Sequence, residues 1–567
     1  MLRITMAQIN PTVGDIAGNI AIARRAAARA VEANAAMIVF PELSLTGYYP
    51  GDLLDEPAFL ARVEQGLATL LEATREHPHL HWVIGAPQKR EGPGKALHNE
   101  LLVLKDGNIV LRYAKQLLPT YGIFDERRHF EPGPDVARVL RIGETQVGFM
   151  ICEDGWNDAH RDYAVNPFQR LADAAPDVVV SINASPSSVG QREHRHHLFA
   201  RASARHGFAL LYVNQFGGQD QLVFDGASFV VTPQHGVVFE AARFQEDIAT
   251  LEFGNAVCTL ADGAPLPAVS RAGLPAMEFY RRQIVLGLRD YARRCGFSKA
   301  VVGCSGGIDS ALTLALAVEA LGANNVAAVT MPSRYSSAGS VDDSKQLCDN
   351  LGITLHEHPI RDLVDKYAHG FGQAFAAPLR GLAHENVQAR IRGTILMEYS
   401  NAFGHLLLTT GNKSELSVGY CTLYGDTNGG LGLIGDIYKT EVFELSRHLN
   451  AAAGRELIPR SIIDKAPSAE LAPDQRDTDS LPPYETLDTI LKQLIEGASL
   501  GSGERAEVQA RFAALTATGE GAALVKRIQH MIARNEYKRR QAPPVLRVRA
   551  RAFGSGRQMP IAAHYHF

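Results

Sequence analysis

The sequence has few cysteines and little net charge. Its six cysteines include no Cys-x-x-Cys pair or other metal-ligand spacing, so neither a disulfide framework nor a zinc site is indicated. The formal net charge is −4 over 567 residues, which argues against a surface built to hold a nucleic acid. These absences favour a small-molecule partner and a reducing compartment.

Long apolar segments are also missing. The first ten residues, MLRITMAQIN, lack the basic start and apolar centre of a signal peptide, and no run of 18 uninterrupted apolar residues occurs. We therefore expect a cytoplasmic protein without membrane contact. With 46% hydrophobic and 21% charged residues the composition is that of a globular protein, and the length predicts two or more domains.

The chain has no fixed-period repeat, and its hydrophobic pattern is that of α/β proteins. Residues 1–255 mix short apolar runs, such as AMIVF and DVVVSINAS, with alanine-rich helical stretches, and Asp106-Gly107 predicts a hairpin turn. Residues 256–275, rich in Pro, Gly and Ala, are interpreted as a connector. Residues 276–567 alternate strands with helix-length segments, beginning with a helix from Met277 to Arg294, which predicts a parallel sheet. The Pro- and Asp-rich stretch 464–486 predicts a long surface loop or lid.

The clearest motif of the second half is VVGCSGGIDSALTLALAV, residues 301–318, which predicts a strand, a glycine-rich turn and a helix. Glycines let backbone N–H groups approach a phosphate closely, and the helix N-terminus adds the positive end of its dipole. The motif is neither a Walker A loop nor GxGxxG. Asp309 adds a carboxylate suited to Mg²⁺. The alternative is a turn that only packs strand against helix.

This loop resembles the SGGxDS loop of the ATP pyrophosphatases, enzymes that split ATP between its α and β phosphates and transfer AMP to a carbonyl oxygen. Residues 384–401, 406–430 and 435–450 resemble the NAD synthetases through HENVQARIRGTILMEYSN, LLLTTGNKSELSVGYCTLYGDTNGG and GDIYKTEVFELSRHLN. The stretch SAELAPDQRDTDSLPPYETLD resembles their bacterial glutamine-dependent form. The resemblance covers the second half and implies a Rossmann-like parallel α/β sheet of the adenine nucleotide alpha hydrolase-like type.

The same resemblance implies a set of binding residues. Those expected to bind ATP are Gly303, Cys304, Ser305, Gly306, Gly307, Ile308, Asp309, Ser310 and Thr410. Those expected to bind deamido-NAD are Asn386, Glu415, Asp426 and Lys538. Lys439 would meet the transferring phosphate, and Asp309 and Glu415 would hold Mg²⁺. The run 538–557 has seven basic and no acidic residues. It would either meet the phosphates of the dinucleotide or form a solvated tail.

In the first half, the stretch MICEDGW, residues 150–156, places Cys152 directly after an apolar run. From these residues alone the thiol is either a packing group or a nucleophile that faces a pocket. A nucleophilic thiol needs a base and a cation or donors for the oxyanion. Glu42 and Lys115 end two other predicted strands and supply both groups.

The stretches FPELSLTGY, YAKQLLPTYGIFDERR and GFMICEDGW resemble the nitrilase superfamily, whose Glu, Lys and Cys follow in this chain order. The resemblance implies an αββα sandwich over residues 1–255. It makes Glu42 the general base, Lys115 the group that stabilises charge and lowers the thiol pKa, and Cys152 the acylated nucleophile. Tyr121 and Ser185 match glutamine-binding positions, and Gln191 occupies a place where the family often has Lys or Arg. The histidines of EHRHH, residues 193–197, fall on different helix faces and predict no metal site.

Together these resemblances imply a C–N ligase of NAD biosynthesis that amidates deamido-NAD with ammonia from L-glutamine. ATP would adenylate the substrate and yield AMP and diphosphate. Because ammonia is mostly protonated in neutral water, we hypothesise that it passes between the sites in a shielded way. A homo-oligomer, at least a dimer through the synthetase domains, is also implied. The alternatives are another glutamine amidotransferase of this class, such as a GMP synthetase, and a non-catalytic dinucleotide sensor.

Overall fold

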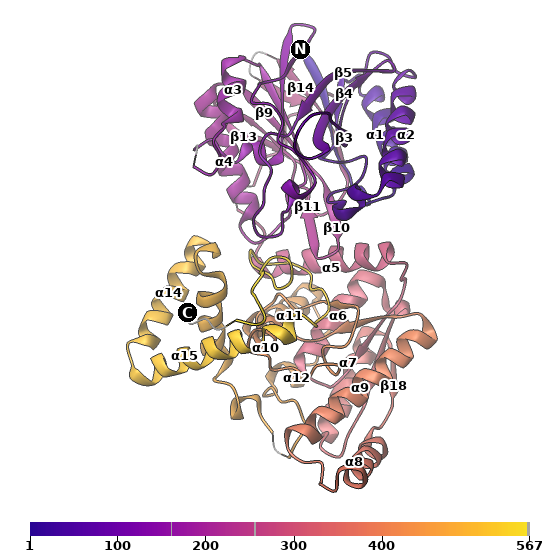
Figure 1. Cartoon of the computed structure of the whole chain (residues 1–567), viewed down its shortest axis with the longest axis vertical. Helices are drawn as coiled ribbons and strands as arrows, with labels where there is room; N and C mark the ends of the chain where they lie inside the picture. Colours follow the sequence, from indigo (N-terminus) through magenta and orange to yellow (C-terminus); the bar gives the residue numbers. More distant parts are fainter. Residues whose placement is uncertain (160, 255–256, 271, 474, 564–567) are drawn as a thin grey trace. The chain divides into compact units, whose positions relative to one another are not determined.

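The computed structural model describes residues 1–159, 161–254, 257–270, 272–473 and 475–563, and the chain forms two compact units (Figure 1). One unit comprises Met1–Gln219 and Val223–Gly273, and the other comprises Asp220–Leu222 and Leu274–Phe567. None of the helices among these residues is long and apolar enough to span a bilayer.

Within the described residues, the first unit contains two large sheets. One has seven strands in the order β15-β14-β1-β2-β3-β4-β5, and the other has six in the order β13-β12-β9-β8-β7-β6. The strands of the first sheet are β1 (Leu2–Gln8), β2 (Met37–Val39), β3 (His81–Lys89), β4 (Leu97–Lys105), β5 (Asn108–Ala114), β14 (Asp247–Gly254) and β15 (Val257–Leu260). Those of the second are β6 (Val139–Ile142), β7 (Thr145–Ile151), β8 (Val178–Asn183), β9 (Ala209–Asn214), β12 (Phe229–Thr232) and β13 (Gly236–Glu240). A small ribbon joins β10 (Phe216–Gln219) to β11 (Leu222–Asp225).

The two large sheets face each other across one apolar core. Side chains of β1 to β5 meet those of β7, β8 and β9 there. Helices α1 (Ile16–Glu32) and α2 (Pro57–Thr74) contact the first sheet, and α3 (Pro167–Asp173) and α4 (Gln191–His206) cover the second, where Phe168 and Phe199 are buried. Strands β8 and β9 are buried on both faces, which explains why their sequences are nearly continuous apolar runs. The predicted αββα sandwich is confirmed.

The predicted turn at Asp106-Gly107 is also confirmed. Both residues have positive φ, +46° and +74°, and Lys105 pairs with Asn108 across the β4–β5 hairpin. Two consecutive positive φ angles are the geometry that an Asp-Gly pair adopts readily in a two-residue hairpin. The turn therefore sets the register of β5, which carries Lys115 at its end.

Within the described residues, the second unit is built on a five-stranded parallel sheet in the order β18-β17-β16-β19-β20. Its strands are β16 (Ala300–Gly303), β17 (Val326–Thr330), β18 (Thr354–Glu357), β19 (Leu406–Thr409) and β20 (Leu431–Gly432). The order in which the chain adds strands reverses at β16: β17 and β18 lie on one side of it, and β19 and β20 on the other. Ligands of such sheets bind beyond the carboxyl ends of the strands at this point. The predicted parallel α/β fold is confirmed.

The helices of this unit include α5, which matches the predicted helix at Met277–Arg294 to within one residue. Their bounds are α5 (Ala276–Arg294), α6 (Ile308–Leu321), α7 (Ala338–Leu351), α8 (Arg361–Phe375), α9 (Leu382–Phe403), α10 (Lys413–Val418), α11 (Lys439–Ala453), α12 (Arg460–Asp464), α13 (Tyr484–Leu491), α14 (Ser502–Thr516), α15 (Gly519–Arg534) and α16 (Glu536–Arg539). The segment from 465 to 483 is mostly irregular where it is described and includes the short 3-10 helix η5 (Asp477–Asp479).

Candidate active sites

In the first unit, the three residues predicted to be catalytic all follow strands. Glu42 lies just beyond β2, Lys115 directly follows β5, and Cys152 directly follows β7, at the start of the 3-10 helix η3 (Cys152–Gly155). Cys152 has a φ of +41°, in the left-handed region that non-glycine residues rarely adopt and that is found often at active sites. On β3, Gly85 lets the chain after Glu42 come close, since a Cβ there would lie 2.2 Å from Leu43 N.

Lys115 lies between two buried carboxylates. Its Nζ donates to Glu42 Oε1 at 2.7 Å and to Glu126 Oε1 at 2.8 Å, and the three side chains are at most 1% exposed. Glu42 Oε1 also accepts from Asn99 Nδ2 at 2.8 Å, and its Oε2 accepts from Ala184 N at 3.1 Å. These donors hold the Glu42 carboxylate in one orientation.

Glu126 is a site residue that the sequence interpretation missed. It lies inside the matched stretch YAKQLLPTYGIFDERR, but its burial could not be read from the letters. Besides Lys115, the carboxylate accepts a hydrogen bond from Tyr48 Oη at 2.7 Å. Burial raises the pKa of Glu126 to about 7, against the attraction of Lys115. Its proximity helps keep the Lys115 ammonium charged.

The pKa of the Cys152 thiol is raised, whereas the expectation was that Lys115 would lower it. Burial raises the pKa of Cys152 well above its ordinary value and the Glu42 carboxylate raises it further, while Lys115 lowers it. Lys115 therefore acts in the predicted direction, but its effect is outweighed. Burial alone would lower the pKa of Lys115, yet Glu126 and Glu42 raise it well above its ordinary range. The free site consequently contains a neutral thiol beside an ammonium group.

The two acids after the thiol have different roles. Asp154 is fully buried and accepts from Ile151 N at 3.1 Å, Gln116 N at 3.0 Å, Leu117 N at 2.8 Å and Tyr113 Oη at 2.7 Å. It thereby fastens the end of β7 to the segment that follows Lys115. Glu153 accepts from the hydroxyls of Tyr121, at 3.0 Å, and Tyr163, at 2.9 Å.

The three residues expected to bind glutamine lie on loops or helix ends of the same unit. The hydroxyl of Tyr121 is close enough to Cys152 for the two groups to interact electrostatically. Ser185 follows β8, and its N–H donates to Asn214 Oδ1 at 2.9 Å. Gln191 is the first residue of α4, after Gly190 with a φ of +79°.

In the second unit, the predicted phosphate loop lies between β16 and α6. Gly306 has a φ of +73°, and a Cβ there would lie 2.3 Å from Ser340 O, so the turn requires glycine. Within the loop, Ser310 Oγ accepts from Ser305 N at 3.3 Å, and Ser305 Oγ accepts from Gly307 N at 3.2 Å. Hydroxyls and backbone amides thus converge at the N-terminus of the 14-residue helix α6, where an anion is favoured.

Lys439 joins the two carboxylates predicted to hold a metal. Its Nζ lies 2.5 Å from Asp309 Oδ2 and 3.2 Å from Glu415 Oε1, although the three residues come from α6, α10 and α11. Asn412 Nδ2 donates to the other oxygen of Asp309 at 2.8 Å. Burial raises the pKa of Glu415 to about 8, with Lys439 opposing and Asp309 adding to the rise. The three groups form one cluster, in which the Lys439 side chain is buried and those of Asp309 and Glu415 are partly exposed.

One cavity brings most of the predicted nucleotide residues together. Its lining includes Gly303, Cys304, Ser305, Gly307, Ile308, Asp309, Ser310, Thr410, Glu415, Asp426 and Lys439. Asn386 and Lys538 are not among its lining residues in the described part of the chain. They contact the loop after α10 instead: Asn386 Oδ1 accepts from Thr422 Oγ1 at 2.8 Å, and Lys538 Nζ donates to the carbonyls of Gly419 and Cys421 at 2.8 and 2.7 Å.

The cavity also has charged residues that the sequence interpretation did not single out. Arg392 lies in the matched stretch HENVQARIRGTILMEYSN, and burial lowers the pKa of its guanidinium to about 10. Lys465 and Glu470 come from the predicted loop 464–486, and their charged groups lie 3.4 Å apart. The predicted loop or lid therefore contributes directly to the cavity.

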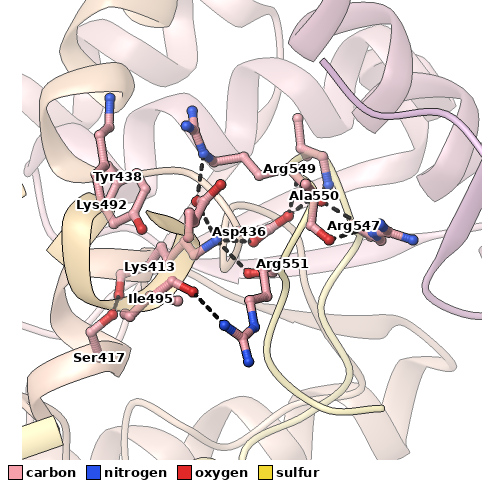
Figure 2. Close-up of polar contacts among 12 residues, drawn as sticks. Lys413, Ser417, Asp436, Tyr438, Lys492, Ile495, Arg547, Arg549, Ala550 and Arg551 are labelled. Carbon is pink, nitrogen blue, oxygen red and sulfur yellow. Dashed lines mark hydrogen bonds and ion pairs between the residues drawn. The ribbon is translucent and has the colours of Figure 1, made fainter. Parts of the chain in front are cut away.

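The basic C-terminal run is largely internal to the second unit. Arg549 is 4% exposed and pairs with Glu441, Glu496 and Glu504 at 2.6 to 2.8 Å. Figure 2 shows Lys413 and Asp436 beside this run: Lys413 Nζ donates to Asp436 Oδ1 at 2.7 Å and to Arg551 O at 2.8 Å. Asp436 Oδ2 accepts from Val548 N and Arg549 N. Because Lys413 begins α10, the run supports the helix that carries Glu415.

Comparisons with known proteins cover both units. Residues 3–260 match the model of the carbon-nitrogen hydrolase family, and residues 280–542 match that of the NAD synthase family. A glutamine-dependent NAD(+) synthetase of Synechocystis sp. is 43% identical, with 100% of this chain and 99% of that protein covered. One of Rhodobacter capsulatus is 42% identical, with 99% and 98% covered. The solved glutamine-dependent NAD+ synthetase of Acinetobacter baumannii in complex with ADP is 36% identical, with a TM-score of 0.76 and coverage of 99% and 98%.

Proposed function

This chain belongs to the glutamine-dependent NAD(+) synthetases, which are ligases, and we propose that its two units divide the reaction between a thiol amidase and an ATP-dependent synthetase. The observation that carries the division is the pair of constellations, one in each unit: Cys152 with Glu42 and Lys115, and the loop 305–310 with its charged cluster. A GMP synthetase or a sensor with a decayed site accounts for neither the full-length relatives nor the intact set of polar groups.

In the amidase unit, Glu42 takes the proton of the Cys152 thiol as the sulfur attacks the side-chain carbonyl carbon of glutamine. The carbonyl oxygen becomes an anion, which the Lys115 ammonium stabilises. Glu42 then returns the proton to the departing nitrogen, the C–N bond breaks, and ammonia leaves a γ-glutamyl thioester. Water activated by Glu42 hydrolyses the thioester to glutamate and restores the thiol. Tyr121, Ser185 and Gln191 are the residues that we propose hold glutamine.

In the synthetase unit, the loop amides and the hydroxyls of Ser305 and Ser310 bind the ATP phosphates, with Thr410 at the end of the neighbouring strand. Asp426 and Glu415 face deamido-NAD, and Asn386 and Lys538 support the loop beside it. The carboxylate oxygen of deamido-NAD attacks the α-phosphorus and diphosphate leaves. Ammonia then attacks the adenylated carbonyl carbon, the added nitrogen releases one proton to solvent, and AMP leaves, which forms the amide. Lys439 stabilises the charge of the transferring phosphate.

The cluster also fits a magnesium ion. Asp309 and Glu415 present hard oxygen ligands of the kind that Mg²⁺ prefers. Both carboxylates contact the Lys439 ammonium, at 2.5 and 3.2 Å, so they lie close enough for one cation to bridge them. When bound there by Asp309 and Glu415, Mg²⁺ would neutralise phosphate charge that the loop amides alone leave uncompensated.

Self-association is part of the proposal. Helices α8 and α9 expose large apolar side chains, with Tyr367 60%, Phe375 67% and Leu382 71% exposed. An apolar surface of this kind is typical of an interface, so we propose a homo-oligomer, at least a dimer, formed through the synthetase units. Light scattering should report a smaller mass for Leu382→Glu than for the control Val110→Glu, which alters an exposed apolar residue of the other unit. The six cysteines are free thiols, which fits a cytoplasmic location.

The division of labour is tested with Cys152→Ala. NAD formation is measured with deamido-NAD and Mg-ATP, using either glutamine or ammonium as the nitrogen source. The variant should lose the glutamine-driven rate and keep the ammonium-driven rate, whereas the control Cys295→Ala, which alters an exposed thiol, should keep both. Loss of both rates in a folded Cys152→Ala protein would contradict the proposal. Adding ¹⁵N-ammonium to the glutamine reaction tests the shielded passage, because little label should then enter NAD.

A further inference from the structure

Two exposed carboxylates and one buried imidazole form a separate group in the first unit. Among the described residues, one ligand atom from each of Asp52, Asp55 and His129 lies within 4.8 Å of the other two. Asp52 and Asp55 belong to the 3-10 helix η1 (Gly51–Asp55), and His129 follows the 3-10 helix η2 (Glu126–Arg128). A 3-10 helix has three residues per turn, so residues three apart share one side. The backbone therefore aligns the two carboxylates.

In the described part of the chain, the imidazole nitrogen that faces them makes no hydrogen bond. His129 Nε2 is buried, and the side chain is only 2% exposed. The nitrogen nevertheless lies 3.2 Å from Asp52 Oδ1 and 3.5 Å from Asp55 Oδ2. A buried polar atom without a hydrogen bond is costly, so this position calls for a further partner.

The other imidazole nitrogen holds the ring in place. His129 Nδ1 is 2.6 Å from Tyr49 Oη, and the Tyr49 hydroxyl is also 3.4 Å from the Asp125 carbonyl oxygen. With the ring held in this way, Nε2 points at Asp52 and Asp55. Two carboxylates and one imidazole nitrogen therefore converge and offer three ligand atoms to a cation.

We propose that Asp52, Asp55 and His129 bind one divalent transition-metal ion of the Zn²⁺ class. In a tetrahedral site with bonds of about 2.0–2.2 Å, ligand atoms lie roughly 3.3–3.5 Å apart. The distances from His129 Nε2 to Asp52 Oδ1 and Asp55 Oδ2, 3.2 and 3.5 Å, are close to this value. A nitrogen ligand favours such an ion over Mg²⁺ or Ca²⁺. The second oxygen of Asp52 meets Arg128 at 3.0 Å, which leaves Oδ1 for the metal. A metal-binding histidine is usually oriented by a hydrogen bond at its other ring nitrogen, and here Nδ1 contacts Tyr49 Oη.

The ion would tie together two segments that lead into the amidase site. Tyr48, four residues before Asp52, donates to Glu126, and Glu126 lies three residues before His129. None of the three ligands belongs to the catalytic constellation. The site therefore has a structural role, in which occupancy holds the Tyr48 and Glu126 segments against each other.

The test measures Zn²⁺ binding by titration calorimetry on the full-length protein, after treatment with a chelator and its removal. Wild type should bind one equivalent that Asp55→Asn weakens at least tenfold and Asp52→Asn/Asp55→Asn abolishes. Glu56→Gln is the matched control, because Glu56 is the residue after Asp55 and the change removes the same charge. Its side chain is exposed and makes no capping hydrogen bond to α2. This variant should bind Zn²⁺ as wild type does. Zn²⁺ should also raise the unfolding temperature of wild type and Glu56→Gln, but not of the double variant.

Two results would overturn the proposal. If wild type binds no Zn²⁺, the three residues form an ion pair only. If the double variant binds as tightly as wild type, the ion is held elsewhere, for example by thiols.

Discussion

Lys115 and Glu42, 73 positions apart in the sequence, are joined by a 2.7 Å contact between Nζ and Oε1 inside the first unit. Glu126 meets the same ammonium at 2.8 Å. One cation is thus shared by two carboxylates beside the Cys152 thiol, and it remains charged because both carboxylates raise its pKa.

Replacing Lys115 by Met should abolish glutamine-driven NAD synthesis and destabilise the first unit by about 3–5 kcal/mol, because two buried carboxylates lose their partner. The urea midpoint of unfolding measures the second effect. The double variant Lys115→Met/Glu126→Gln removes one of the stranded charges, and should regain part of the stability but none of the amidase activity. A double variant no more stable than the single one would refute this account of the charge balance.

The Cys152 thiol should be alkylated faster as the pH rises, with no plateau up to pH 9. Burial and the Glu42 carboxylate hold the pKa of the thiol above its ordinary value, so the thiolate fraction keeps growing roughly tenfold per pH unit across this range. Iodoacetamide labelling at Cys152, followed by mass spectrometry from pH 6 to 9, measures the profile. A rate that levels off near neutral pH would show instead that a thiolate–ammonium pair exists before substrate binds.

Asp154→Asn should lower the glutaminase rate and cost about 1.5–3 kcal/mol of stability, since an amide group cannot accept every hydrogen bond that the carboxylate accepts from three backbone N–H groups and Tyr113. Ammonium-driven synthesis should be unchanged. The matched change Glu153→Gln should destabilise less, because its partners are tyrosine hydroxyls that can reorient their protons. Equal unfolding midpoints for the two variants would argue against a special role for Asp154 in the turn.

In the second unit, Arg549→Met should destabilise the fold by about 3–5 kcal/mol and reduce synthesis with either nitrogen source, because Glu441, Glu496 and Glu504 lose a buried partner. Arg551→Gln alters an exposed side chain of the same run and leaves its backbone carbonyl free to accept from Lys413. It should therefore change the midpoint little. If Arg549→Met were as stable as Arg551→Gln, the three ion pairs of Arg549 would not stabilise the unit.

Much of this organisation could be predicted from the sequence. The apolar runs located the strands, Asp106-Gly107 located a hairpin, and the glycines of SGGIDS located the turn before α6. Glu42, Lys115 and Cys152 were identifiable because each follows an apolar strand in a recognisable stretch. What these signals share is that they are local: each depends on residues within a few positions of one another.

The remaining features depend on side chains from distant parts of the chain. Glu126 resembles any surface acid until the fold buries it against Lys115, and the direction of the Cys152 pKa shift follows from burial, which no local pattern specifies. The basic run at 538–557 resembled a phosphate-binding or solvated segment, yet packing gives Arg549 three acidic partners 45 to 108 positions away. The sequence by itself determined the elements, the two motifs and the family. Only the tertiary structure decided which charged side chains pair with one another and how deeply they are buried, because both depend on how non-consecutive strands and helices pack.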